Sequence, residues 1–162
     1  MYTDSDILEL FKCEKRVVDP PSREYKEERG HLKKAFSLLS LDGRFMFNAF
    51  IRCNIHFSEN FTVGLDFNPR EAKGTICLFR CNGAHGENRM LPHHSSCHIH
   101  RASAESINSG LKPESNITPT EEYSTLDEAI QFFVKEINLS NEDRRDYFPT
   151  PDTQATLNFE NE

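Results

Sequence analysis

Two apolar runs separated by a turn signal stand out in the first half of the chain. Residues 34–41 and 45–54 are rich in Phe, Leu, Ile and Met, and Asp42-Gly43 lies between them. Apolar side chains that recur at every second position are typical of a strand with one buried face. Asp-Gly favours a tight hairpin because both residues readily adopt positive φ. We therefore predict two antiparallel strands joined by this turn.

The same pattern continues beyond the hairpin. Residues 61–68 carry apolar side chains at alternate positions from Phe61 to Phe67, and residues 75–83 form another short apolar run. Residues 97–102 are compatible with a short returning strand. Strands at such close spacing are typical of an antiparallel meander. The pattern predicts a sheet of four or five strands.

Helical periodicity appears at both ends of the chain. Residues 4–17 follow a run of N-cap candidates and predict a short first helix. Residues 125–139 carry the strongest helical pattern, because their apolar side chains recur at helical spacing and Thr125 and Glu128 have the spacing of a capping box. We expect this helix to pack on the sheet. The segments 22–31 and 111–123 are predicted to be connectors, and the fold class is α+β.

Length and charge narrow the class of protein. A chain of 162 residues fits one domain, which we place at residues 1–148, followed by an acidic, mobile tail at 149–162. The net charge of −7 argues against a broad surface for polyanions but leaves room for a local basic patch. The N-terminus lacks a signal-peptide pattern, and the five cysteines are odd in number and scattered. We expect a cytoplasmic protein with no membrane contact.

Candidate chemistry concentrates in residues 85–101, which hold five of the seven histidines. One interpretation is metal binding: His98 and His100 would share a face of a strand, with His93 and His94 as further ligands. Their spacing fits no common metal motif, so we expect neither a metal nor another cofactor. A second interpretation is structural: the histidines make ordinary hydrogen bonds or bind a partner protein.

The third interpretation is acid–base catalysis. Imidazole titrates near neutral pH, so two histidines can act as general base and general acid, as in metal-independent ribonucleases. His85, His98 and His100 are the candidates for these roles. An Arg side chain would hold the phosphate, and Arg80, Arg101 and Arg52 are the candidates, since the meander brings their strands near the histidine segment.

Four segments resemble a family of small uncharacterised bacterial proteins. They are SLDGRFMFNAFIRCN, LFRCNGAHG, CHIHRASAESINSGLKPE and EEYSTLDEAIQFF. The family has an Arg-x-Asn-Gly-x-His-Gly strand end followed by a His-x-His-Arg or His-x-His-Lys segment. The resemblance covers residues 32–140 and implies a bacterial or phage origin, without an activity.

LFRCNGAHG and LPHHSSCHIH are also similar to the RYDNxPHH…PHHxH pattern of TumE-type toxins from bacterial toxin–antitoxin pairs. The resemblance implies a toxin-like protein that acts on RNA and has an antitoxin as its partner. It implies substrate-site roles for the following residues: Arg80, Asn82, His85, His93, His94 and His98.

Together these patterns favour a bacterial protein, toxin-like or defence-associated, that acts on RNA or another phosphodiester by metal-independent histidine chemistry. RNA would bind at a local basic pocket. Two alternatives stay open: a noncatalytic interaction or regulatory module that binds another protein, and a metal-dependent enzyme that uses the His-x-His pair.

Overall fold

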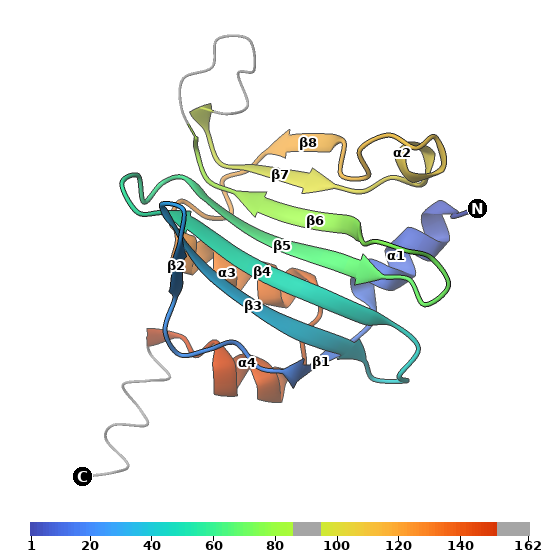
Figure 1. Ribbon diagram of the computed structural model, residues 1–162, viewed down its shortest axis with the longest axis horizontal. Helices are drawn as coiled ribbons and strands as arrows, with labels where there is room; N and C mark the ends of the chain where they lie inside the picture. Colours follow the sequence, from blue (N-terminus) through green and yellow to red (C-terminus); the bar gives the residue numbers. More distant parts are fainter. Residues whose placement is uncertain (86–94, 152–162) are drawn as a thin grey trace.

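The computed structural model describes residues 1–85 and 95–151, which form an α+β fold around one antiparallel sheet (Figure 1). In this described part the strands lie in the order β1-β3-β4-β5-β6-β7-β8, and β2 pairs with β3. The strands are β1 (Lys15–Asp19), β2 (Lys26–Glu28), β3 (His31–Ser40), β4 (Met46–Asn54), β5 (Phe61–Asn68), β6 (Ile76–Asn82), β7 (His98–Arg101) and β8 (Asn116–Pro119). The helices are α1 (Asp4–Lys12), α2 (Ala104–Asn108), α3 (Leu126–Glu136) and α4 (Asn141–Tyr147).

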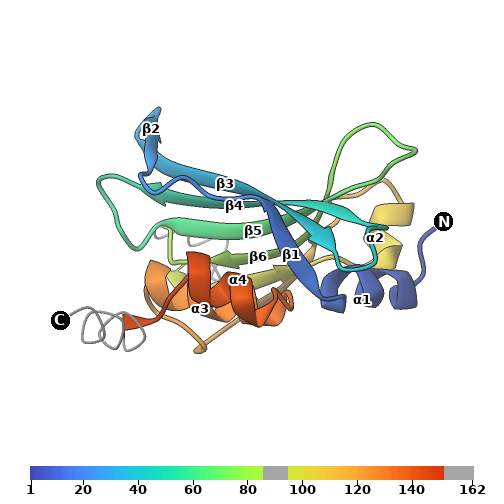
Figure 2. The same cartoon turned by 90° about the horizontal axis from the view of Figure 1, so that it is seen from below.

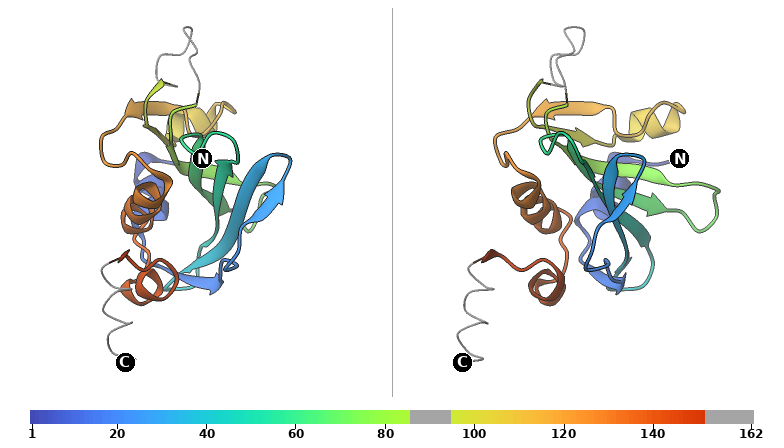
Figure 3. Two further views of the ribbon diagram at one scale, coloured as in Figure 1. Left: turned by 90° about the vertical axis from the view of Figure 1, so that its left-hand side faces the viewer. Right: turned by 60° about the vertical axis from the view of Figure 1, so that its left-hand side comes forward.

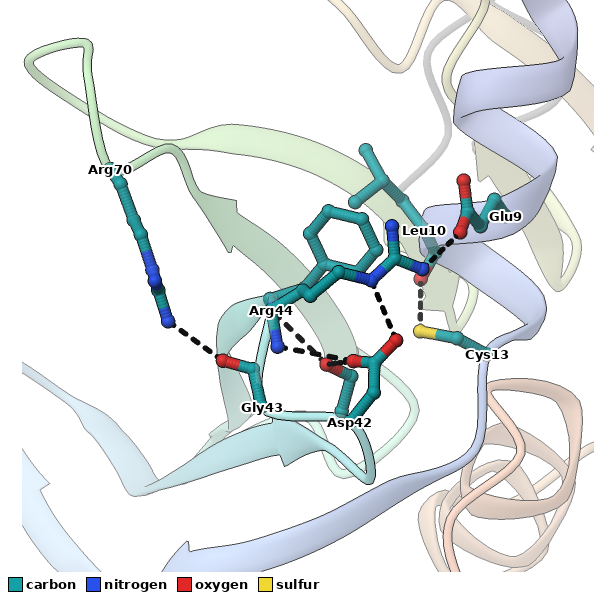
Figure 4. A network of polar contacts seen from close by, with 9 residues as sticks. Glu9, Leu10, Cys13, Asp42, Gly43, Arg44 and Arg70 are labelled. Carbon is teal, nitrogen blue, oxygen red and sulfur yellow. Dashed lines mark hydrogen bonds and ion pairs between the residues drawn. The ribbon is translucent and has the colours of Figure 1, made fainter.

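The hairpin between β3 and β4 turns at Asp42-Gly43 as predicted, but its loop spans residues 41–45 and only Gly43 of the two has a positive φ, so the tight two-residue turn that we expected is wrong. The two strands pair antiparallel, and Gly43 has a φ of 77° between them. Arg44 donates a hydrogen bond to Asp42 and a second to Glu9 of α1 (Figure 4). Arg70 donates to the carbonyl oxygen of Gly43 at 2.7 Å. Arg44 thus connects this turn to the first helix, and Arg70 connects it to the segment between β5 and β6.

Helices α1, α3 and α4 lie on one side of the sheet (Figures 2 and 3). Phe133 of α3 stacks on Phe79 of β6, with ring centroids 5.9 Å apart and ring planes 6° apart. Phe11 of α1 meets the same Phe79 ring edge-on at 5.0 Å. Burial of these rings removes a large apolar area from water, so this face forms the hydrophobic core. Within the described ranges, no element covers the opposite face of β3 to β6.

A buried lysine closes the ends of two helices. Lys15 is 0% exposed, and its Nζ lies 2.8 Å from each of three carbonyl oxygens, those of Phe11, Cys13 and Ile137. The last carbonyls of a helix have no partner within the helix, and a cation is favoured at that end. Lys15 therefore joins the C-terminal ends of α1 and α3.

The α+β class and the antiparallel sheet are confirmed, but the predicted number of strands is wrong. The sheet has eight strands in the described ranges because β1, β2 and β8 also pair. The first helix stops at Lys12, and β1 occupies part of the range 4–17 that we had predicted as helical. Every residue of β2 and β8 is exposed, so neither strand has a buried face to create alternation. Helix α4, also without a buried residue, was missed for the same reason.

Two sequence predictions concern the chain as a whole. Phe148, at the proposed domain boundary, is buried and packs against Phe36 with ring centroids 5.1 Å apart. Residues 152–162, most of the predicted tail, lie outside the described residues. No helix among the described residues has the length and apolar character needed to cross a membrane.

Candidate functional site

Strand register brings the candidate side chains together on the open face of the sheet. Arg52 of β4 pairs with Thr62 of β5, Thr62 with Asn82 of β6, and Asn82 with His98 of β7. One step along the strands, Arg80 pairs with His100. Directly opposed residues have Cβ atoms about 5 Å apart. The basic, amide and imidazole groups therefore form two adjacent rows across the sheet.

A pocket of about 450 Å³ opens at these rows. Its walls combine cations, imidazoles and neutral polar groups from residues far apart in sequence. The cations are Arg52, Arg80 and Lys112, the imidazoles are His31, His85 and His100, and the neutral polar groups are Asn60, Thr62 and Asn82. Such a lining suits an anionic ligand with several oxygen atoms.

Three imidazoles lie side by side at one end of the pocket. The ring centroid of His98 lies 5.2 Å from that of His85 and 5.1 Å from that of His100. His98 is 0% exposed and does not line the pocket, whereas His85 and His100 do. The Nδ1 of His98 lies 2.8 Å from the carbonyl oxygen of Ser96, so Nδ1 carries the proton and donates. His98 is thus fixed by Ser96 and packs between its two neighbours.

Tyr123 supports the histidines from the core side. Its buried hydroxyl lies 3.0 Å from the backbone oxygen of Asn82 and 2.9 Å from that of His98. Burial raises the pKa of Tyr123, so the hydroxyl keeps its proton and donates. This contact holds the paired ends of β6 and β7 against the core.

Arg80 lies between an acid and an imidazole. Its Nη2 is 3.3 Å from Oε1 of Glu114 and 3.4 Å from Nδ1 of His100. Lys112 also reaches Glu114, at 3.5 Å. Burial, with a smaller contribution from the charge of Arg80, lowers the pKa of His100 to about 4. The His100 imidazole is therefore neutral at physiological pH.

Arg101 does not join this group. It pairs with Phe79, and its guanidinium lies 4.9 Å from the Phe79 ring centroid and 5.4 Å from that of Phe11, on the face covered by the helices. Glu136 of α3 is 3.9 Å from it. Consecutive strand residues point to opposite faces, so Arg101 and His100 cannot serve the same pocket. This placement argues against Arg101 as a phosphate ligand.

Several pocket residues were missed from the sequence. His31 begins β3, Asn60 precedes β5, and Lys112 and Glu114 lie between α2 and β8. No spacing in the sequence connects these four residues with Arg80, and only the tertiary fold brings them near it. Thr62 is different, because the alternation of residues 61–68 already places it opposite the buried positions.

The metal interpretation depends partly on residues outside the described ranges. His93 and His94 fall there, so the structure does not place these candidate ligands. Among the residues that are described, no group of three or more His, Cys, Asp or Glu side chains is arranged to hold a metal ion. The prediction that the protein binds no metal stays a prediction.

No protein-family model, curated protein or solved structure matches this chain. The resemblances to the bacterial family and to TumE-type toxins therefore stay predictions, and the function has to be inferred from the geometry of the pocket.

Proposed function

We propose that the pocket binds and cleaves an RNA phosphodiester without a metal ion. The observation that carries the proposal is the pair of imidazoles of His85 and His100 on the wall of a pocket that also holds Arg52, Arg80 and Lys112. Metal-independent cleavage of RNA needs a proton acceptor, a proton donor and positive charge at the phosphate. All three are present within one pocket.

The charge of the pocket favours a phosphate. Three cations line it, and Glu114 is the carboxylate that pairs with two of them. The side chain of Glu114 is only 7% exposed and makes ion pairs with Arg80 and Lys112. Arg52 is exposed and has no ion-pair partner among the described residues, so it is available to a ligand.

The reaction follows from these roles. The neutral imidazole of His100 takes the proton of the ribose 2′-hydroxyl, and the 2′ oxygen forms a bond to phosphorus. The bond from phosphorus to the 5′ oxygen breaks, and His85 gives that oxygen a proton. Arg80 stabilises the negative charge that develops on the phosphoryl oxygens. The products are a 2′,3′-cyclic phosphate and a free 5′-hydroxyl, with no redox change.

The three histidines have different roles in this scheme. His85 and His100 contact the substrate, whereas buried His98 is a positioning residue. Replacement of His98 by Ala removes a buried ring between the two others, and we expect it to lower the melting temperature as well as the rate. His100→Ala and His85→Ala should mainly lower the rate of cleavage.

The test is cleavage of a fluorescent single-stranded oligoribonucleotide by purified, untagged protein in a metal chelator. We expect cleavage by wild type, a cyclic phosphate in the product by mass spectrometry, and a loss of roughly 100-fold or more in His100→Ala, His85→Ala and Arg80→Ala. A substrate with a 2′-deoxyribose at the cleaved position should resist cleavage, because the nucleophile is absent. His56→Ala is the matched control, since His56 is exposed and lies outside the pocket.

The outcomes separate the candidate functions. If wild type leaves every RNA substrate intact, the ribonuclease proposal is wrong. The proposal also fails if the three variants cleave as fast as wild type. Activity that the chelator abolishes would instead favour the metal-dependent enzyme.

A noncatalytic module is the second candidate, and the engagement of Arg80 by Glu114 is the observation that favours it. A paired guanidinium suits recognition of a ligand as well as catalysis. In a bacterial cytosol, the catalytic function would be toxic and would need an antitoxin, whereas the noncatalytic one would not. Expression in a bacterial host, with growth and RNA integrity as readouts, distinguishes the two.

A further inference from the structure

A second hollow lies next to the pocket on the same face of the sheet. This hollow has a volume of about 530 Å³ and shares Arg52 with the pocket. Its lining includes Lys26 of β2, Lys33 of β3 and Phe50 of β4. Because they share Arg52, the two hollows are neighbours, and we call the stretch that they cover together the path.

Strand register arranges the side chains along this path in one row across six strands. Lys26 pairs with Lys33, and Lys33 pairs with Arg52. From Arg52 the row continues through Thr62 and Asn82 to His98. Adjacent strands are about 4.8 Å apart, so the row from β2 to β7 is about 24 Å long. Its first half carries a positive charge on each of three consecutive strands.

The cations of this row are accessible. Lys26 and Arg52 are exposed, and the Lys33 side chain is 37% exposed. Glu28 lies 3.7 Å from Lys33, but both side chains are exposed, and such pairs exchange readily with solvent. Lys34 is engaged elsewhere, because its Nζ donates to the Arg23 carbonyl. On a protein with a net charge of −7, this concentration of positive charge marks a binding path for a polyanion.

An aromatic side chain lies beside the row. Phe50 is half-buried, lines the second hollow and reaches across to Gly64 of β5, where an added Cβ would come within 2.2 Å of its Cζ. Gly64 therefore makes the space that the ring occupies. The ring is partly exposed and lies on the face of the sheet opposite the hydrophobic core. A basic groove combined with such a ring is the usual device for binding single-stranded nucleic acid.

We propose that a single strand of RNA lies along this row, with its phosphates at Lys26, Lys33 and Arg52, a base stacked on Phe50, and the cleaved phosphodiester at Arg80. This inference rests on the proposed function, since it names the substrate of that pocket as a single-stranded oligonucleotide rather than a dinucleotide or a duplex. At about 3.4 Å per stacked nucleotide, 24 Å holds no more than about seven nucleotides.

The binding test measures fluorescence anisotropy with oligoribonucleotides of increasing length and with a duplex of the same sequence. His100→Ala protein is used so that cleavage does not interfere. We expect affinity to rise with length up to about seven nucleotides and then to level off. The duplex should bind at least about 10-fold more weakly, because its bases cannot stack on Phe50.

Charge variants test the row itself. Lys26→Gln with Lys33→Gln removes two phosphate contacts, so the slope of log affinity against log salt should fall by about 1.4 and affinity at about 0.1 M salt by about 25-fold. Lys73→Gln with Lys135→Gln is the matched control, because these exposed lysines lie in the β5–β6 turn and on α3. Phe50→Ala should weaken binding of single strands by about 5-fold or more.

The failures can be told apart. Suppose that wild type cleaves RNA but the Lys26→Gln, Lys33→Gln variant and its control bind RNA with equal affinity. The path is then wrong, and the proposed function stands. If His100→Ala protein binds single strands with the expected salt slope but wild type cleaves nothing, the path stands and the catalytic proposal is wrong. If RNA does not bind, and an acidic peptide binds wild type but not the Lys26→Gln, Lys33→Gln variant, the row is a protein-binding surface. That result overturns the inference.

Discussion

Lys15 offers a quantitative test of how the two main helices are joined to the sheet. In Lys15→Met, a side chain of similar length replaces the ammonium, and the carbonyls of Phe11, Cys13 and Ile137 lose their donor. An orphaned buried carbonyl costs about 2 kcal/mol, so the three together cost about 6 kcal/mol. We therefore expect a large loss of stability, reduced by one opposing effect.

The opposing effect is the cost of burying a charge. Burial lowers the pKa of Lys15 from 10.5 to about 8, which corresponds to about 3 kcal/mol against the charged form in the folded state. Met carries no charge and avoids this cost. The expected net loss in Lys15→Met is therefore about 3 kcal/mol at pH 7.

The pH dependence of this loss has a definite sign. Between pH 8 and pH 10.5 the unfolded chain holds the Lys15 proton more tightly than the folded chain, so wild type gains stability as the pH rises. The variant lacks this gain. The difference in unfolding free energy between wild type and Lys15→Met should thus widen from pH 7 to pH 10, while groups common to both proteins largely cancel.

Urea unfolding followed by far-ultraviolet circular dichroism measures the difference, because the chain has no Trp. Lys12→Met is the control: the Lys12 side chain is 51% exposed, and its pair with Glu136 at 3.6 Å should contribute less than about 1 kcal/mol. A loss below about 1 kcal/mol in Lys15→Met would refute the argument. So would a difference that narrows as the pH rises.

Three further predictions concern the core, the end of β6 and the pocket. Phe133→Ala should cost about 3 to 5 kcal/mol in chemical unfolding, since the ring is 0% exposed and stacks on Phe79; a cost under about 1 kcal/mol would contradict the packing. Gly83→Ala should cost about 2 kcal/mol or more, because its Cβ would lie 2.1 Å from the backbone oxygen of Glu59; an unchanged melting temperature would contradict this. His100 has a pKa lowered from 6.5 to about 4, so the unfolded state takes up this proton first on acidification and wild type loses stability between these pH values. His100→Gln should therefore lose roughly 3 kcal/mol less stability than wild type over that range. If the unfolding free energies of the two proteins fall in parallel on acidification, the pKa of His100 is not lowered.

The central hairpin could be predicted because its signals are local. Asp42-Gly43 lies between two apolar runs, and residues 61–68 continue the same alternation. Burial on one face of a strand leaves this period in the sequence whatever the neighbouring strands are. The helix at residues 126–136 was predictable for the same reason, since Phe133 and its apolar neighbours recur at helical spacing.

The candidate site was only partly predictable. The cluster around His98 and His100 indicated a polar site, and the parity of a strand placed both side chains on one face. The same alternation places Arg101 on the opposite face. We had predicted it as a phosphate ligand because it follows His100 in the sequence. Neighbours in sequence are not neighbours in a sheet, because the pleat separates them.

The sequence by itself determined the elements that have a buried face, namely the strands of the hairpin and its continuation, and the helix of Phe133. Only the tertiary structure decided the edge strands β2 and β8, whose residues are all exposed and whose pairing depends on backbone hydrogen bonds common to any sequence. It also decided the pocket, where His31 and Lys112 join Arg80 from distant parts of the chain. Register, set by the packing of the whole sheet, determines which side chains converge, and no local pattern records it.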